Sequence, residues 1–424
     1  MSSEYDRPEG TLGILMAFEG ITDSATVVNG PTGCKYYPGV ATEQAWPCRD
    51  KECYTEKPFK YYRRFFFTQP RVPCTYMDAD DYIMGTGSKL DEAFAEVMAS
   101  GPNLVGLVNS PGASLIGETL SLKDEKGIVV RMENPLPSVP FGTAFQETMI
   151  KILEALSPKK IKKRKGINLI GMSVWNLDWE DSVRDLKDLL SLCNITVNAV
   201  IGAGCSVADL KGSGKAELNV IVHRDIGLEI AKWYERSLDV RYVESKMGAP
   251  IGFDALEDWI LRICEELNAD PSKAMKKINE QRERTANVLL SLYTVHKTTV
   301  GKTFSVAAEG SLAYPVARFL YSYLGLYPVA LRTGLDTSFS AEISKFTEEN
   351  GLSISEEAFD TPADVMLADG NSVASAIFRG LIPEGFDIVR PGRRIVRIKE
   401  RPVLGLGGTM RLLDSVMNTI RRMD

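Results

Sequence analysis

The stretch of sequence that decides the fold is VVNGPTGC, residues 27–34. Its two valines end a short apolar run, and a turn rich in glycine and proline follows. Such a run is typical of a buried strand in a parallel sheet, where ligand-binding loops follow the carboxyl ends of the strands. Gly33 has no side chain, so we predict that the backbone there approaches a cofactor closely. Cys34 then lies at the sheet edge, either as an iron–sulfur ligand or as a small buried residue in a tight turn.

The same pattern continues outward from this stretch. Short apolar runs alternate with amphipathic stretches, and this alternation predicts a parallel sheet covered by helices on both faces. In the first part of the chain, strands are predicted at residues 26–28, 81–84, 104–108 and 128–130, and helices at 88–100 and 144–156.

The alternation then restarts twice. After a basic run at 159–165, strands are predicted at 167–175, 195–201 and 218–222, with helices at 179–193, 226–238 and 254–267. A long polar helix from 270 to 296 leads to strands at 303–308, 328–332 and 364–368, and to helices at 312–324, 340–349, 372–378 and 408–421. We therefore predict an α/β fold of three doubly wound domains: residues 1–160, residues 161–300 with the bridging helix, and residues 301–424.

The composition excludes several classes of protein. The chain of 424 residues has 50 Lys and Arg against 56 Asp and Glu, a net charge of −6, which argues against a nucleic-acid partner. No apolar run reaches the roughly 18 residues that a membrane span needs. The polar start, MSSEYDRPEG, lacks the features of a signal peptide. We expect a cytoplasmic protein without a membrane partner.

The cysteines favour a metal centre. Seven is too few for a disulfide scaffold of this length, and in a reducing compartment clustered cysteines are typical of metal ligands. Cys48 and Cys53 form a C-x4-C pair between charged residues, and Cys74 follows them. Together with Cys34 they are the four ligands that one 4Fe–4S cluster needs. The alternative is four ordinary thiols. The two histidines are too few for a histidine-rich metal site.

His223 directly follows a predicted strand and precedes a predicted helix. A lone histidine is often a structural group with satisfied hydrogen bonds. A histidine at the end of a strand that faces a cleft is more often functional. Both interpretations remain open from the residues alone.

Several segments in order along the chain resemble a known family, component 1 of nitrogenase. Its relatives include the dark-operative protochlorophyllide reductases and the reductive cyclase of coenzyme F430 synthesis. The matching segments are LGILMAFEGI (12–21), NGPTGC (29–34), DDYIMGTGSKL (80–90), NSPGASLIGE (109–118), MGAPIG (247–252) and RPVLGLGGTMR (401–411).

The resemblance implies three Rossmann-like domains around a central cleft. It also implies an iron–sulfur cluster where two subunits meet, and an ATP-dependent iron protein, the nitrogenase reductase, that docks there and delivers electrons. The subunit partner is a homologous chain or a second copy, in a dimer or tetramer. The run of aromatic and basic residues at 61–67 also favours a buried interface.

Two departures from the family pattern bear on the chemistry. The family brings three cysteines per chain to the interface cluster, and only Cys34 falls on such a position. Glu9 and Pro111 stand near the other two, so Cys48 and Cys53 are candidate substitutes and Cys74 is the weakest candidate. His223 falls where nitrogenase has the cysteine ligand of its active-site cofactor. Dinitrogen reduction on that cofactor is therefore not expected, and a second metal centre, a tetrapyrrole or a substrate is the candidate ligand of His223.

Three functions are compatible with these observations. The first is the catalytic component of a nitrogenase-like two-component reductase, with His223 as the catalytic residue. The second is a non-catalytic scaffold on which a metal cofactor is assembled. The third is a protein that closes its domains on a small ligand without a metal.

Overall fold

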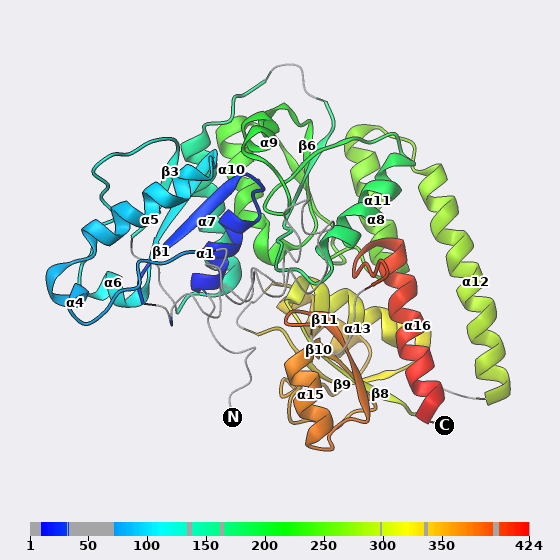
Figure 1. The fold of residues 1–424 in the computed structure, drawn as a ribbon. Coiled ribbons are helices and arrows are strands. Elements are labelled where there is room, and N and C mark those ends of the chain that lie inside the picture. Colours follow the sequence, from blue (N-terminus) through cyan, green and yellow to red (C-terminus); the bar gives the residue numbers. More distant parts are fainter. Residues whose placement is uncertain are drawn as a thin grey trace.

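The computed structural model describes residues 10–31, 33, 72–133, 138–161, 165–296, 299–334, 338–392 and 398–423. These residues form three parallel β-sheets with helices packed around them (Figure 1). The predicted α/β class with several parallel-sheet domains is confirmed. No helix in the described ranges is both long and apolar enough to cross a bilayer.

The first sheet has the strand order β1-β2-β3 and lies in the N-terminal part of the chain. Its strands are β1 (Ser24–Asn29), β2 (Leu104–Asn109) and β3 (Val129–Met132). Every residue of β2 is buried, as expected of a parallel strand covered on both faces. The helices of this part are α1 (Gly10–Glu19), α4 (Asp81–Met84), α5 (Gly87–Ala99), α6 (Pro111–Leu115) and α7 (Phe141–Leu156).

The second sheet has the strand order β5-β4-β6-β7. It consists of β4 (Ile167–Ile170), β5 (Val197–Val200), β6 (Leu218–Ile221) and β7 (Tyr242–Val243). The elements around it are α8 (Trp179–Ser191), α9 (Val207–Gly212), the 3-10 turns η3 (Ser213–Lys215) and η4 (Arg224–Ile226), α10 (Leu228–Leu238) and α11 (Phe253–Leu267).

The third sheet has the strand order β11-β10-β8-β9. Its strands are β8 (Thr303–Ala307), β9 (Tyr327–Arg332), β10 (Val365–Asp369) and β11 (Glu384–Val389). The remaining helices are α12 (Ser272–His296), which leads into this sheet, α13 (Gly310–Leu324), α14 (Ser340–Glu349), α15 (Gly370–Phe378) and α16 (Gly405–Met423).

All three sheets share one topological feature. The strand that comes first in the chain is flanked on both sides: β4 by β5 and β6, and β8 by β9 and β10. β1 pairs with β2 on one side and bridges Cys74 through Val28 on the other. The strand order reverses at this first strand, and ligands of doubly wound sheets bind beyond the carboxyl ends at such a point. The fold therefore offers three candidate crevices.

The three sheets are joined through a shared core rather than by thin linkers. One hydrophobic cluster includes residues of every sheet, among them Val28, Ile170 and Val306. Helix α7 packs against α1 and also against α10 of the second sheet. Helix α16 returns from the third sheet to pack against α8 and α11 (Figure 1). The domain limits at residues 160 and 300 stay a prediction.

One predicted strand is wrong. Residues 81–84 form helix α4, with Ile83 and Met84 82% and 84% exposed. The carboxylate of Asp78 accepts hydrogen bonds from the backbone N–H groups of Asp80 and Asp81, at 3.0 and 3.2 Å. An aspartate that bonds the backbone ahead of it begins a turn rather than a strand, and the apolar run misled the prediction.

Candidate functional site

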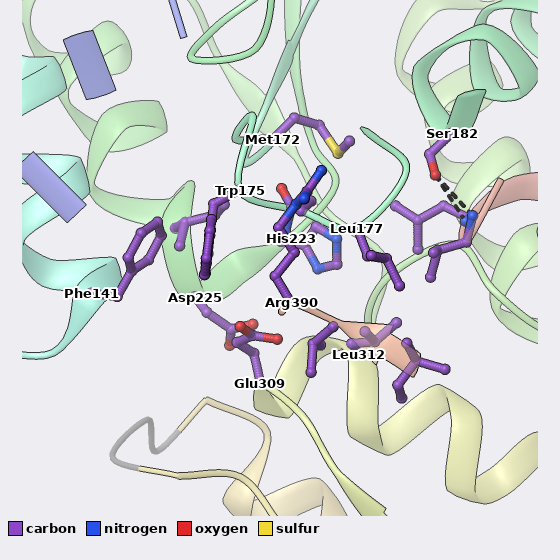
Figure 2. Close-up of a pocket in the computed structure, with 16 residues that line it drawn as sticks. Phe141, Met172, Trp175, Leu177, Ser182, His223, Asp225, Glu309, Leu312 and Arg390 are labelled. Carbon is purple, nitrogen blue, oxygen red and sulfur yellow. Dashed lines mark hydrogen bonds between the residues drawn. The ribbon is translucent and has the colours of Figure 1, made fainter. Parts of the chain in front are cut away.

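A cavity lies where the carboxyl ends of strands in the second and third sheets face each other (Figure 2). The loop after β4 supplies Trp175 and Leu177, and the segment after β6 supplies His223. From the third sheet, Glu309 follows β8 and Arg390 follows β11. The cavity therefore lies at the crevice that the reversed strand order predicts for the second sheet.

The backbone around His223 is tightly constrained. The strand β6 ends at Ile221, and two residues later the His223 N–H donates to the carbonyl of Gly171, at 3.2 Å. Gly171 has a positive φ of +83°, and a Cβ there would lie 2.2 Å from the His223 carbonyl oxygen. Only glycine fits this position, because it has no side chain and adopts positive φ without strain. The close approach of the two segments fixes where the His223 ring enters the cavity wall.

The imidazole of His223 is almost fully buried, with 4% of the residue exposed. Its Nδ1 lies 3.1 Å from the hydroxyl of Ser311, the second residue of α13. Burial lowers the pKa of His223 to about 4, because the buried site disfavours the charged ring. At neutral pH the ring is therefore uncharged, with one protonated nitrogen and one lone pair.

A second contact ties the same serine to Asp225 in η4. The Ser311 backbone N–H donates to both carboxylate oxygens of Asp225, at 3.3 and 3.2 Å, and its hydroxyl donates to Oδ2. The Gln146 amide in turn donates to the Asp225 carbonyl, at 3.1 Å. His223, Ser311 and Asp225 thus form a chain of hydrogen bonds that crosses from the second sheet to the third.

The rest of the wall is mainly apolar and aromatic. Phe141, Leu177 and Leu312 line it, and the Arg390 guanidinium lies 5.8 Å from the centre of the Trp175 ring (Figure 2). A cation over an indole face is attracted by the electrons of the ring. The third sheet thus brings two charged groups to the cavity, Glu309 and Arg390, and Arg390 is the one over the Trp175 ring.

The size of the cavity limits what it holds in this conformation. Its volume is about 30 Å³, enough for about one water molecule, whereas small-molecule pockets usually measure about 300–1,000 Å³. A tetrapyrrole, one of the candidate ligands of His223, does not fit in this space. Within the described ranges, no three His, Cys, Asp or Glu side chains are grouped to hold a metal ion.

The edge of the first sheet is built from buried amides. The Asn29 side chain donates to Oδ1 of Asn109, at 3.0 Å, and accepts from the Thr75 hydroxyl, at 2.9 Å. The backbone N–H of Gly30 also donates to that hydroxyl, at 3.0 Å. These bonds anchor the start of the loop that leads to Cys34.

The predicted cluster ligands are only partly within the described residues. Cys34, Cys48 and Cys53 lie outside them, as does the aromatic run at 61–67. Cys74 is described, and it is buried in the hydrophobic core with 3% exposed. Gly33 is exposed, and no atom of the described residues lies within 4 Å of the position a Cβ would take. The roles of all these residues stay predictions.

Sequence reasoning singled out His223 but not Ser311, Asp225 or Arg390. Ser311 and Asp225 lie within four residues of predicted strands, and this position is the signal that could have marked them, whereas Arg390 follows β11, a strand that was not predicted. That signal is common to every loop at a sheet edge. It does not tell which loops of the second and third sheets meet.

Comparison with known proteins gives a consistent result. The profile of the family described as "Nitrogenase component 1 type Oxidoreductase" matches residues 10–421. The chain is 26% identical over 298 residues to a subunit of the light-independent protochlorophyllide reductase of Methylobacterium sp. (strain 4-46), an alignment that covers 67% of this chain and 56% of the relative. The corresponding protein of Synechococcus sp. (strain WH7803) is 25% identical over 262 residues, 55% of this chain and 47% of the relative. The chain thus spans about half the length of these curated relatives.

The fold is also found among solved structures. "Nitrogenase Cp1 at pH 6.5" matches 99% of this chain and 93% of its own, with a TM-score of 0.74 and 16% identity. At that identity the match shows a shared fold only. The family profile, by contrast, covers nearly the whole chain and confirms the resemblance seen in the sequence motifs. The chain therefore belongs to the family of nitrogenase component 1 type oxidoreductases.

Proposed function

We propose that this chain is the catalytic component of a nitrogenase-like two-component reductase. An ATP-dependent iron protein supplies electrons, an iron–sulfur cluster at a subunit interface receives them, and a small substrate is reduced beside His223. The observation that carries the proposal is the place of His223, buried in the wall of a cavity between two sheet edges. The family and the name of the curated relatives, one subunit of a reductase, support it.

The residues of this chain contribute binding and proton chemistry. The neutral imidazole of His223 holds a lone pair that binds an acidic proton or a metal ion. Phe141, Trp175 and Leu177 exclude water from the same wall. Arg390 offers a positive charge to a substrate that becomes more negative on reduction. The cluster, when bound, supplies one electron at a time, and Cys34, Cys48 and Cys53 with Cys74 are its proposed ligands.

Cluster loading is the first test of the proposal. The wild-type protein is purified without oxygen, its iron and acid-labile sulfide are counted, and the reduced protein is examined by EPR. Cys34→Ala is expected to lose the iron and the EPR signal. The matched control is Cys193→Ala, which removes a thiol buried at the end of α8. Equal iron content in both variants would contradict the ligand assignment, and a wild-type protein without iron would contradict the cluster.

Electron uptake is the second test. A reduced nitrogenase-type iron protein and ATP are mixed with the chain, and oxidation of the iron protein is followed with and without a set of small reducible molecules; protochlorophyllide, the substrate in the relatives' name and a tetrapyrrole larger than the cavity, is the comparison. Electron uptake with turnover supports the reductase. Cluster loading without turnover of any small molecule would support the scaffold instead. His223→Ala is expected to stop substrate reduction while the EPR signal of the cluster remains.

A further inference from the structure

We propose that Ser311 and Asp225 are positioning residues that hold His223 in a single tautomer, with its proton on Nδ1 and the lone pair of Nε2 left for the cavity. The proposal deepens the proposed function, because it states which way protons move at His223. The tautomer itself is a property of the folded chain and does not depend on turnover.

The direction of the hydrogen bonds begins at the backbone. The Ser311 N–H can only donate, and it lies 3.3 and 3.2 Å from the two oxygens of the Asp225 carboxylate. Both oxygens therefore act as acceptors. The Ser311 hydroxyl donates to Oδ2 of the same carboxylate. In all three contacts Ser311 is the donor and the carboxylate of Asp225 is the acceptor.

The next bond follows from the proton count. A serine hydroxyl has one proton and two lone pairs. Because the proton of Ser311 is directed to Asp225, the hydroxyl can only accept in its contact with Nδ1 of His223, at 3.1 Å. Nδ1 must then be the protonated nitrogen. The buried ring is neutral, as its lowered pKa indicates, so Nε2 keeps its lone pair.

The arrangement leaves Nε2 for the cavity. No described residue forms a hydrogen bond with Nε2, and His223 lines the cavity wall. The nitrogen offered to a ligand is therefore an acceptor: it takes a proton from a substrate or donates its pair to a metal ion. With the opposite tautomer the same nitrogen would be a donor. Ser311 and Asp225 thus decide, through the His223 ring, whether Nε2 accepts or donates a hydrogen bond, and Asp225 also lines the cavity itself.

Both sheets are needed for this control. His223 and Asp225 follow β6, whereas Ser311 begins α13 after β8. The Gln146 amide holds the Asp225 carbonyl from a third element, α7. The tautomer is therefore fixed by how the second and third sheets dock.

The test is magic-angle-spinning ¹⁵N NMR of the as-purified protein labelled with ¹⁵N-histidine, at pH 7.5. The chain has two histidines, so His296→Gln leaves the ring nitrogens of His223 as the only histidine signals. Protonated and unprotonated ring nitrogens have well-separated shifts, and with ¹³C also placed in the ring, correlation of each nitrogen with Cγ (Nδ1) or Cδ2 (Nε2) identifies which nitrogen carries the proton. We expect protonated Nδ1 and unprotonated Nε2. Protonated Nε2 in the His296→Gln protein, whose His223, Ser311 and Asp225 are unchanged, would overturn the proposal.

Asp225→Ala gives a second test. It removes the acceptor of the Ser311 hydroxyl, which frees the hydroxyl proton to point at Nδ1. We expect the proton of His223 to move to Nε2. Ser311→Ala, which deletes the acceptor of the Nδ1 proton, is expected to give a mixture of both tautomers. A folded Asp225→Ala protein with unchanged His223 signals would refute the role of Asp225.

The outcomes separate this proposal from the proposed function. The measurement needs no iron protein, ATP or substrate. If Nδ1 is protonated but the protein takes up no electrons, the proposed tautomer is supported and the proposed reductase function is contradicted. If the protein reduces a substrate but Nε2 is protonated, the reductase function is supported and the proposed tautomer is contradicted.

Discussion

Acidification is expected to destabilise the folded chain through His223. The ring has an ordinary pKa of 6.5 in the unfolded chain, and burial lowers it to about 4 in the folded protein. Between these two values the unfolded state binds a proton that the folded state does not. The free energy of unfolding therefore falls as the pH drops below 6.5, and the loss is complete below pH 4.

The size of the effect follows from the difference in pKa. One pKa unit corresponds to about 1.4 kcal/mol, so the shift from 6.5 to about 4 is worth about 3 kcal/mol in full. At pH 5 the expected loss is about 2 kcal/mol, because the unfolded ring is by then mostly protonated and the folded ring is not.

The assay is urea unfolding at pH 7.5 and pH 5.0, followed by tryptophan fluorescence. Four of the five tryptophans, Trp175, Trp179, Trp233 and Trp259, belong to the part of the chain around the second sheet, so the signal reports on the surroundings of His223. His223→Gln removes the titrating group, and His296→Gln is the matched control. The wild type and the control are expected to lose about 2 kcal/mol more than His223→Gln on acidification. An equal loss in both variants would refute the reasoning.

Two further predictions concern stability. Gly171→Ala is expected to lower the free energy of unfolding by about 2 kcal/mol or more, because the new Cβ meets the His223 carbonyl oxygen at 2.2 Å. The control is Gly351→Ala, where φ is also positive but the Cβ enters open space. Equal urea midpoints for the two variants would contradict this prediction. Asn109→Ala is expected to lower the free energy of unfolding by at least about 2 kcal/mol, measured by thermal or urea unfolding. The substitution leaves the Asn29 amide and the backbone carbonyls of Glu118 and Glu133 without their hydrogen bonds. The control is Asn103→Ala, at an exposed asparagine, which is expected to lower the free energy of unfolding clearly less.

The alternation of apolar runs and amphipathic stretches determined most of the fold. Nearly every predicted strand and helix is present. A parallel strand that is buried on both faces needs apolar residues at successive positions, so it is visible in the sequence as a continuous apolar run. The place of His223 at a strand end was likewise readable. The exception at residues 81–84 shows the limit of this signal, since Asp78 starts a turn there by bonding the backbone and the apolar side chains of α4 remain exposed.

The contacts that make the site were decided only by the tertiary structure. Ser311 is 88 residues from His223 and 86 from Asp225, and no local pattern links a helix start after β8 to a loop after β6. The C-terminal helix is a second case, because Gly407 of α16 donates to the Asp185 carboxylate of α8 across 222 residues. Periodicity records whether a side chain is buried, but not against which part of the chain. The docking of the second and third sheets therefore decides which ring nitrogen of His223 carries the proton, and the sequence alone left this open.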